Sequence, residues 1–307
     1  MAAEGDNNFI RYVYRGEEDE VIPLEATHIT VLAKVIPRRA FQSHPNIVEV
    51  ICSERVKKIK NSAFCNCPYL HRVIMPNVKI VEGRAFYNCG ELTDVECGQL
   101  EVIRRTAFRH CRSLRVINMQ SVRILEREAF GFCEALMEVK FGSKLESFGW
   151  SPFLNCTSLE RITIPLKDGL IDDSDSTFMG CERLEHVDLI EGEIHEAIAA
   201  LHLDEWRNDM NEEIDSINKD LLDSPGGGWD DEYDYDPGEK ASDIYSWIRS
   251  VLRKIIHYQT KHGRILDEAA TTLQFALPQD IMMNNVLPFL ALPSHTFEVE
   301  EDEDEDY

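Results

Sequence analysis

The chain has 307 residues, with 56 acidic residues against 32 basic residues and a formal net charge of −24 at pH 7. A chain of this length can bury a sizeable core, and its 43% hydrophobic content is ordinary for globular proteins. Nucleic acids and anionic membrane surfaces bind proteins through clustered Lys and Arg, so the acidic balance disfavours both as partners.

The first residues contain no cationic start followed by an apolar run, and the chain contains no uninterrupted apolar stretch of about eighteen residues. We therefore expect neither a cleaved secretion signal nor a membrane span, and an intracellular location, cytoplasmic or nuclear. The nine cysteines would then be reduced thiols, because disulfides persist mainly in oxidising compartments.

Residues 1–32 precede a repeat and contain two apolar runs, 9–14 and 21–31, on either side of a polar turn at 16–20. Both runs are rich in Val, Ile, Thr and Tyr, which is typical of strands. We expect this segment to cap the open N-terminal end of the repeat.

A phenylalanine then recurs every 22 to 25 residues, which marks seven copies of a repeat within 33–190. The phenylalanines are Phe41, Phe64, Phe86, Phe108, Phe130, Phe153 and Phe178. Alanine precedes the first five of them, and a cysteine follows three residues after all but the first, where His44 stands instead. These cysteines are Cys67, Cys89, Cys111, Cys133, Cys156 and Cys181.

Further along each copy the pattern is L-x-x-V-x-M, as in Leu70, Val73 and Met75. Side chains alternate along a strand, so the last two apolar residues point to one side and each copy contributes a short strand. One such strand buries too little to be stable alone, and the copies must stack in parallel. The A-F-x-x-C segment lacks this alternation and predicts a tight helical turn behind, with the phenylalanines stacked inside.

These motifs, L-x-x-V-x-M/I-P, V-x-x-I and A-F-x-x-C, resemble the BspA-like leucine-rich repeats over about residues 33–190. The resemblance implies an α/β repeat solenoid, a curved stack of short parallel strands that line a concave face, with tight helical turns behind. It implies recognition of other macromolecules and supplies no catalytic motif. The chain also resembles a subset of such proteins with a C-terminal helical extension.

Residues 191–277 change period, because their apolar residues recur at spacings of three and four. The pattern predicts two amphipathic helices, at about 193–222 and 239–276, joined by a flexible acidic linker at 223–238. The first helix is mainly acidic and the second carries many basic residues, so the two are expected to pair antiparallel as a hairpin. The alternative is an interface for a second copy, with self-association through these helices.

Residues 278–307 comprise an apolar segment and a strongly acidic end, which we expect to be a disordered tail. Most of the excess of acidic over basic residues lies in the last third of the chain. A run of carboxylates of this kind could bind basic proteins.

The residues between the apolar anchors of each strand face outward and form the candidate binding surface for an unidentified protein partner. The candidate partner-binding residues are Arg72, Ile74, Asp94, Glu96, Asn118, Glu138, Lys140, Arg161, Thr163, His186 and Asp188. The same rows also contain Glu49, Ile51 and Val116. Neighbouring coils often place opposite charges side by side. The alternative to binding a partner is that these charged side chains pair with one another.

No carboxylate pair, Ser-His-Asp set or glycine-rich phosphate loop is evident, so we expect no catalytic residues, no cofactor and no enzyme activity. Six cysteines in line, one per coil, do not converge as a zinc site requires, so no metal is expected. A redox-responsive role for the stacked thiols is the alternative function. In that case Cys65, which follows Phe64 and is expected to point outward, would react first. The simpler interpretation is that the repeat cysteines fill small apolar slots.

Overall fold

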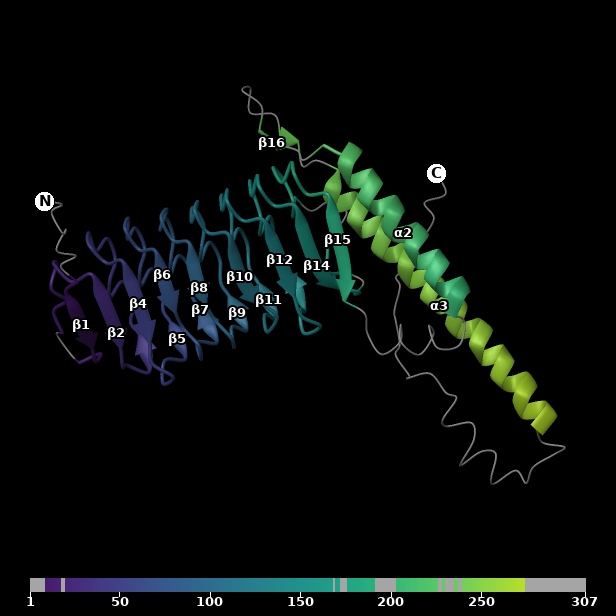
Figure 1. The fold of residues 1–307 in the computed structure, drawn as a ribbon, viewed down its shortest axis with the longest axis horizontal. Coiled ribbons are helices and arrows are strands. Elements are labelled where there is room, and N and C mark those ends of the chain that lie inside the picture. Colours follow the sequence, from purple (N-terminus) through teal and green to yellow (C-terminus); the bar gives the residue numbers. More distant parts are fainter. Residues whose placement is uncertain are drawn as a thin grey trace, which may run out of the picture.

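The computed structural model describes residues 9–17, 20–167, 169–171, 176–190, 203–225, 228–229, 235–236 and 239–273. It shows an elongated stack of coils with two helices at its C-terminal end (Figure 1). The expected linker at 223–238 lies partly outside the described residues, and the expected apolar segment and acidic tail at 278–307 lie wholly outside them.

One side of the stack is a nine-stranded parallel sheet in the order β1-β2-β4-β6-β8-β10-β12-β14-β15. Its strands are β1 (Arg11–Tyr14), β2 (His28–Val31), β4 (Glu49–Cys52), β6 (Arg72–Ile74), β8 (Asp94–Glu96), β10 (Val116–Met119), β12 (Glu138–Phe141), β14 (Arg161–Pro165) and β15 (His186–Ile190). The register aligns equivalent residues of successive copies, with Val50 opposite Val73 and Val73 opposite Val95. The L-x-x-V-x-M spacing therefore predicted the seven strands from β4 to β15 and their direction, and the apolar runs at 9–14 and 21–31 predicted strands where β1 and β2 lie.

The first six repeats, from that of Phe41 to that of Phe153, also contain a second, two-residue strand that the sequence did not predict. These strands form a six-stranded parallel sheet in the order β13-β11-β9-β7-β5-β3. They are β3 (Val35–Ile36), β5 (Lys58–Ile59), β7 (Ile80–Val81), β9 (Val102–Ile103), β11 (Ile124–Leu125) and β13 (Ser147–Phe148). Runs of two residues show no usable alternation in a sequence, and only the pairing between coils makes them strands.

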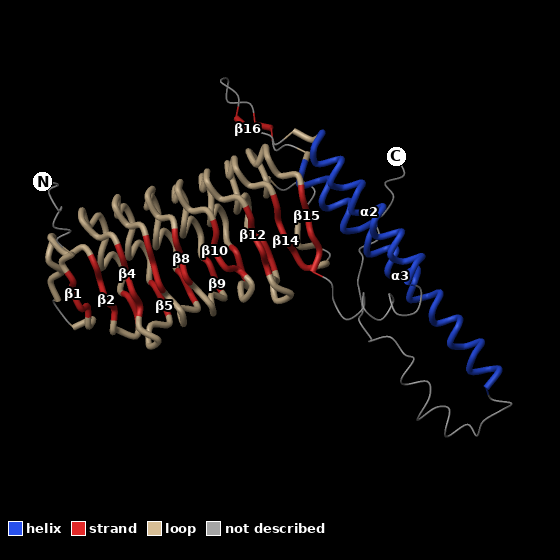
Figure 2. Tube along the Cα trace, viewed as in Figure 1, coloured by secondary structure: helices blue, strands red, loops and turns tan. Residues whose placement is uncertain are grey.

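The A-F-x-x-C segments form hydrogen-bonded turns, and Figure 2 shows helix only at the C-terminal end of the described chain. Two residues in each of the first six turns adopt the left-handed conformation, as Arg84 (φ 57°) and Asn88 (φ 58°) do. A left-handed residue other than glycine costs about 1–2 kcal/mol. Hydrogen bonds between coils offset this cost, since Phe86 N donates to Ala107 O at 2.8 Å and Asn88 N to Arg109 O at 2.8 Å. The left-handed residues are what keep these turns from continuing as helix.

The core is a column of phenylalanine rings between the two sheets. Rings of successive coils stack with centroids 4.8 to 6.1 Å apart, from Phe41 to Phe178. All seven rings are buried, as the sequence predicted. Tyr14 extends the column toward the N-terminus, with its ring 5.1 Å from that of Phe41.

Two helices, α2 (Leu203–Asp223) and α3 (Lys240–Leu273), follow the last coil and pair antiparallel. Two ion pairs join them, with Lys254 Nζ 2.9 Å from Glu213 Oε1 and Lys261 Nζ 2.6 Å from Glu205 Oε2. Their opposite charges predicted this pairing, which lies within one chain. Between the helices, β16 (Gly228–Trp229) and β17 (Tyr235–Asp236) form a short antiparallel pair.

The helical pair closes the C-terminal end of the stack. The Nζ of Lys240, at the start of α3, donates to the carbonyls of Leu184 (2.7 Å) and Leu221 (2.6 Å). Burial lowers the pKa of this ammonium. Asn218 of α2 accepts a hydrogen bond from Val187 N on the last strand at 3.4 Å. In the described part of the chain, no helix combines the length and apolar character needed to cross a membrane.

Candidate protein-binding face

The outward side chains of the nine-stranded sheet form one continuous surface, here called the strand face, from β4 to β15. Inward and outward positions alternate along each strand. In β10, Ile117 and Met119 are buried whereas Val116 and Asn118 are exposed. Because the strands are short and their ends are fixed by the turns, these outward positions are held in register from coil to coil.

The structure places all eleven candidate residues on outward positions of this face. Arg72 and Ile74 lie on β6, Asp94 and Glu96 on β8, Asn118 on β10, Glu138 and Lys140 on β12, Arg161 and Thr163 on β14, and His186 and Asp188 on β15. The register makes successive members neighbours, with Arg72 opposite Asp94, Asn118 opposite Lys140, and Thr163 opposite Asp188.

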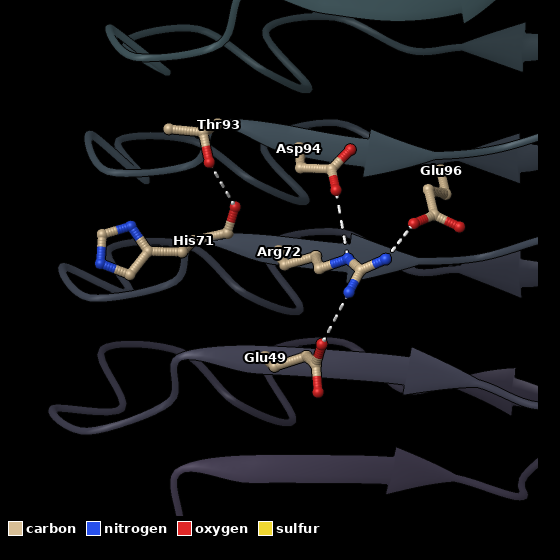
Figure 3. Close-up of polar contacts among 6 residues, drawn as sticks. All are labelled: Glu49, His71, Arg72, Thr93, Asp94 and Glu96. Carbon is tan, nitrogen blue, oxygen red and sulfur yellow. Dashed lines mark hydrogen bonds and ion pairs between the residues drawn. The ribbon is translucent and has the colours of Figure 1, made fainter. Parts of the chain in front are cut away.

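Arg72 lies at the centre of a charge cluster that spans three coils (Figure 3). Its guanidinium approaches Asp94 Oδ2 at 3.1 Å and Glu49 Oε1 at 3.5 Å, and also donates to Glu96. The hydrogen bond with Glu96 raises the pKa of Arg72. Three carboxylates around one guanidinium leave this part of the face negatively charged.

The C-terminal half of the face carries simpler pairs. Arg161 donates to Asp188 Oδ2 at 2.8 Å in the next coil, and Lys140 lies 2.8 Å from Glu138 on its own strand. Exposed pairs of this kind contribute only about 0–1 kcal/mol each. The charges of the face are therefore partly paired with one another, and the fold does not depend on them.

Apolar side chains on the same face stand out by their exposure. Val116 is 61% exposed and Ile51 is 38% exposed. A depression of about 480 Å³ lies beside Val116 and is lined by Ile74, Pro76, Asp94, Val95, Glu96, Cys97, Gly98, Val116, Ile117 and Asn118. The sequence placed Val116 and Ile51 in the outward rows, but only the structure distinguishes them as exposed apolar contacts.

A second depression, of about 410 Å³, lies beside Lys140 and Thr163. Its lining is more polar and includes Gln120, Ser121 and Lys144. Together the two depressions divide the strand face into an acidic, apolar part and a part with exposed lysines.

The repeat cysteines have a structural role. The thiol of Cys111 donates to the carbonyl of Phe86, one coil earlier, at 3.2 Å, and Cys133 donates to Phe108 O at 3.2 Å. The same bond recurs from Cys67, Cys89, Cys156 and Cys181. Burial raises the pKa of Cys111 and Cys133, so these thiols are protonated at neutral pH.

The expectation that Cys65 points outward is wrong. Its side chain is buried, with 6% exposure. Burial raises the pKa of its thiol, whereas Arg84 and Arg39 lower it. A protonated thiol is a poor nucleophile, and the redox alternative has no support in this geometry.

His71, the histidine nearest to the charge cluster of Arg72, takes a local partner. His71 lies at the edge of the strand face, where its Nδ1 is 2.9 Å from the carbonyl oxygen of Glu91 and its own carbonyl accepts a bond from Thr93 (Figure 3). In the ranges that the structure describes, no group of three or more His, Cys, Asp or Glu side chains is arranged to hold a metal ion.

The parallel coils, the ring column and the outward strand face define a repeat solenoid with an extended surface. The BspA type leucine rich repeat region, a family model with six copies, matches residues 34–121 and 101–199, more than half of the chain. The chain belongs to this family of leucine-rich-repeat proteins. No curated protein sequence matches it.

Solved structures of bacterial leucine-rich-repeat proteins are similar to the chain at low identity. One from Bacteroides ovatus has 20% identity over 59% of this chain and 42% of its own, with a TM-score of 0.44. A cell surface protein from Faecalibacterium prausnitzii has 19% identity over 55% of this chain and 53% of its own, with a TM-score of 0.37. A T. pallidum protein has 19% identity over 59% of this chain and 69% of its own, with a TM-score of 0.37. The chain thus spans about half the length of the first two.

Proposed function

We propose that the protein is a non-catalytic scaffold that binds a protein partner through the strand face. Membership of a leucine-rich-repeat family supports this role, because stacked repeats present an extended surface suited to protein recognition. The contacting residues would be the eleven candidates together with Ile51 and Val116.

The observation that carries the proposal is the exposed Val116 beside the depression of about 480 Å³. A few residues in desolvated pockets near the centre of a protein interface contribute most of its binding energy, whereas charges at the rim direct association. Asp94 and Glu96 are already held by Arg72. Because these two side chains are fixed before binding, less side-chain conformational entropy is lost on association.

Affinity capture with matched variants tests this proposal. Val116→Glu places a carboxylate at the centre of the face, and we expect capture of specific partners to fall at least tenfold, which corresponds to about 1.4 kcal/mol. Tyr69→Glu is the control, because Tyr69 is 57% exposed but lies in a turn outside the nine-stranded sheet.

Circular dichroism would establish that both variants keep the fold. Partners retained equally by wild type and Val116→Glu would exclude the strand face. Equal loss of partners in Val116→Glu and Tyr69→Glu would indicate that the interface includes the turns.

A further inference from the structure

Basic side chains collect at the turn that follows the short strands, away from the strand face. Five of them, Arg38, Arg39, Lys60, Arg84 and Arg105, are exposed and lie on four successive coils. We call these five the basic strip. Backbone hydrogen bonds join their segments, since Arg39 N donates to Asn61 O at 3.1 Å, Ser62 N to Gly83 O at 3.1 Å, and Arg84 N to Arg105 O at 3.2 Å.

The carboxylates nearest to the basic strip are engaged by other groups. Glu82 is 2.5 Å from Lys58 and accepts a bond from Asn61 N at 3.0 Å. Glu126 pairs with Arg104 and accepts a bond from Arg105 N at 2.9 Å. Among the described residues, no carboxylate lies within ion-pair distance of the five side chains of the strip.

Like charges gather at the same place. Burial lowers the pKa of the neighbouring Arg109, which pairs with Glu128. Tyr87 raises this pKa, and Arg127, Arg105 and Arg84 lower it. Arg84 and Arg39, on the coils to either side of Cys65, both lower the pKa of its thiol. The five side chains of the strip thus make no ion pair in the described structure, although Lys60 and Glu82 attract each other at longer range, in a protein whose net charge is −24.

The chain itself contains a segment of complementary charge. Eight of the nine residues from 298 to 306 are Asp or Glu, and the ninth is Val299. We propose that the basic strip is the docking surface for this acidic segment, which folds back onto the coils of its own molecule. The segment then supplies carboxylates to basic side chains that make no ion pair among the described residues.

The chain is long enough to make this contact. Helix α3 starts beside Leu184, and its 34 residues extend about 51 Å at 1.5 Å per residue. Four coil steps of about 4.8 Å separate the last coil from that of Arg84, so the path along the helix and the stack is roughly 70 Å. The 24 residues from 274 to 297 can span about 80 Å when extended.

Tethering favours the chain's own segment over other anions. A nucleic acid or a separate acidic protein must approach against the net charge of −24. A covalently linked segment makes that approach as an intramolecular step, so its effective concentration does not depend on the protein concentration.

Carbodiimide coupling of the full-length protein, which joins a carboxylate to a lysine in direct contact, tests the proposal. We expect a cross-link from residues 298–306 to Lys60, detected by mass spectrometry. The Lys58 to Glu82 pair serves as the internal positive control, and the exposed lysines Lys144 and Lys167 report non-specific coupling. Raising the salt from 0.05 M to 0.5 M should lower the Lys60 yield several-fold, because exposed charges are screened.

Charge reversal provides the decisive variant. Arg84→Glu with Arg105→Glu should lower the Lys60 yield at least fivefold, and Arg84→Lys with Arg105→Lys should retain it. Arg112→Glu with Arg115→Glu, which reverses two exposed arginines outside the strip, is the matched control and should change little. Glutamate is compatible with the left-handed backbone at position 84, because Glu128 occupies the equivalent position two coils later.

Mixing equal amounts of isotopically light and heavy protein identifies the molecule that supplies the segment. Cross-links within light or heavy chains only would support the proposal. Mixed cross-links alone would assign the segment to a second copy and overturn it. Equal coupling to Lys60, Lys144 and Lys167, or a yield unchanged by Arg84→Glu with Arg105→Glu, would also overturn it.

Discussion

The repeat coils and the C-terminal helical pair are stabilised by different kinds of contact. Each coil buries a Phe ring between its neighbours and closes its turn with backbone and thiol hydrogen bonds to adjacent coils. The helical pair depends on side chains, including Tyr258 bonded to Asp209 and Lys254 paired with Glu213. Substitutions in the coils should therefore cost more free energy than substitutions between the helices.

Truncating the ring column should have the largest effect. Phe108 is fully buried, with its ring 5.1 Å from that of Phe86 and 5.2 Å from that of Phe130. Phe108→Ala should lower the free energy of unfolding by about 3–5 kcal/mol, because it removes apolar contact and leaves a cavity. Urea unfolding followed by circular dichroism measures this. Tyr69→Ala, at an exposed turn position, should change it by less than about 0.5 kcal/mol, and equal losses in the two variants would refute the column's role.

Alkaline pH should destabilise the coils through their thiols. Burial raises the pKa of Cys97 to about 11 and that of Cys52 to about 12, from an ordinary value of 9.0. Between pH 9 and these values the folded protein holds protons that the unfolded chain releases. The protonated thiols therefore contribute their full stabilisation of the fold below about pH 9. As the pH rises above this value, the free energy of unfolding falls by about 1.4 kcal/mol per pH unit for each thiol.

Urea unfolding at intervals from pH 8 to 10.5 would measure that slope. In the double variant Cys52→Ala with Cys97→Ala, the free energy of unfolding should fall less steeply with pH, because about two fewer protons are released on unfolding. A wild-type profile that stays flat above pH 9 would contradict the assignment of buried, protonated thiols.

A smaller and local effect is expected in the helical pair. The hydroxyl of Tyr258 donates to Asp209 Oδ2 at 2.8 Å. Tyr258→Phe removes a hydrogen bond to a charged group and should cost about 1.5–3 kcal/mol. Hydrogen exchange should quicken in α2 and α3 and stay unchanged in the coils, whereas Thr260→Ala, which removes only an exposed local bond to Ile256 O, should leave both unchanged. Faster exchange throughout the coils would show that the two regions open together.

Much of the architecture could be predicted because the same residue types recur at the same place in each copy. The phenylalanine period gave the number of coils, and the alternation after Leu70 gave the strands and their outward residues. The opposite charges of α2 and α3 gave their pairing. Each of these features depends on residue types and spacings that are visible along the chain without knowledge of which coils are in contact.

Other features depend on contacts between coils and could not be predicted. Cys65 is buried although its position suggested exposure, because exposure on a solenoid depends on how the adjacent coils pack. The left-handed backbone at Thr106 has no signal in its residue type, since β-branched residues disfavour it. It is held by the hydrogen bond from Thr106 N to Arg127 O at 3.0 Å.

The candidate face divides in the same way. The sequence by itself determined which side chains point outward, because alternation along a strand fixes that choice. Only the tertiary structure decided that three carboxylates converge on Arg72 and that Val116 remains exposed. These outcomes depend on distances between neighbouring coils, which arise when the chain has stacked.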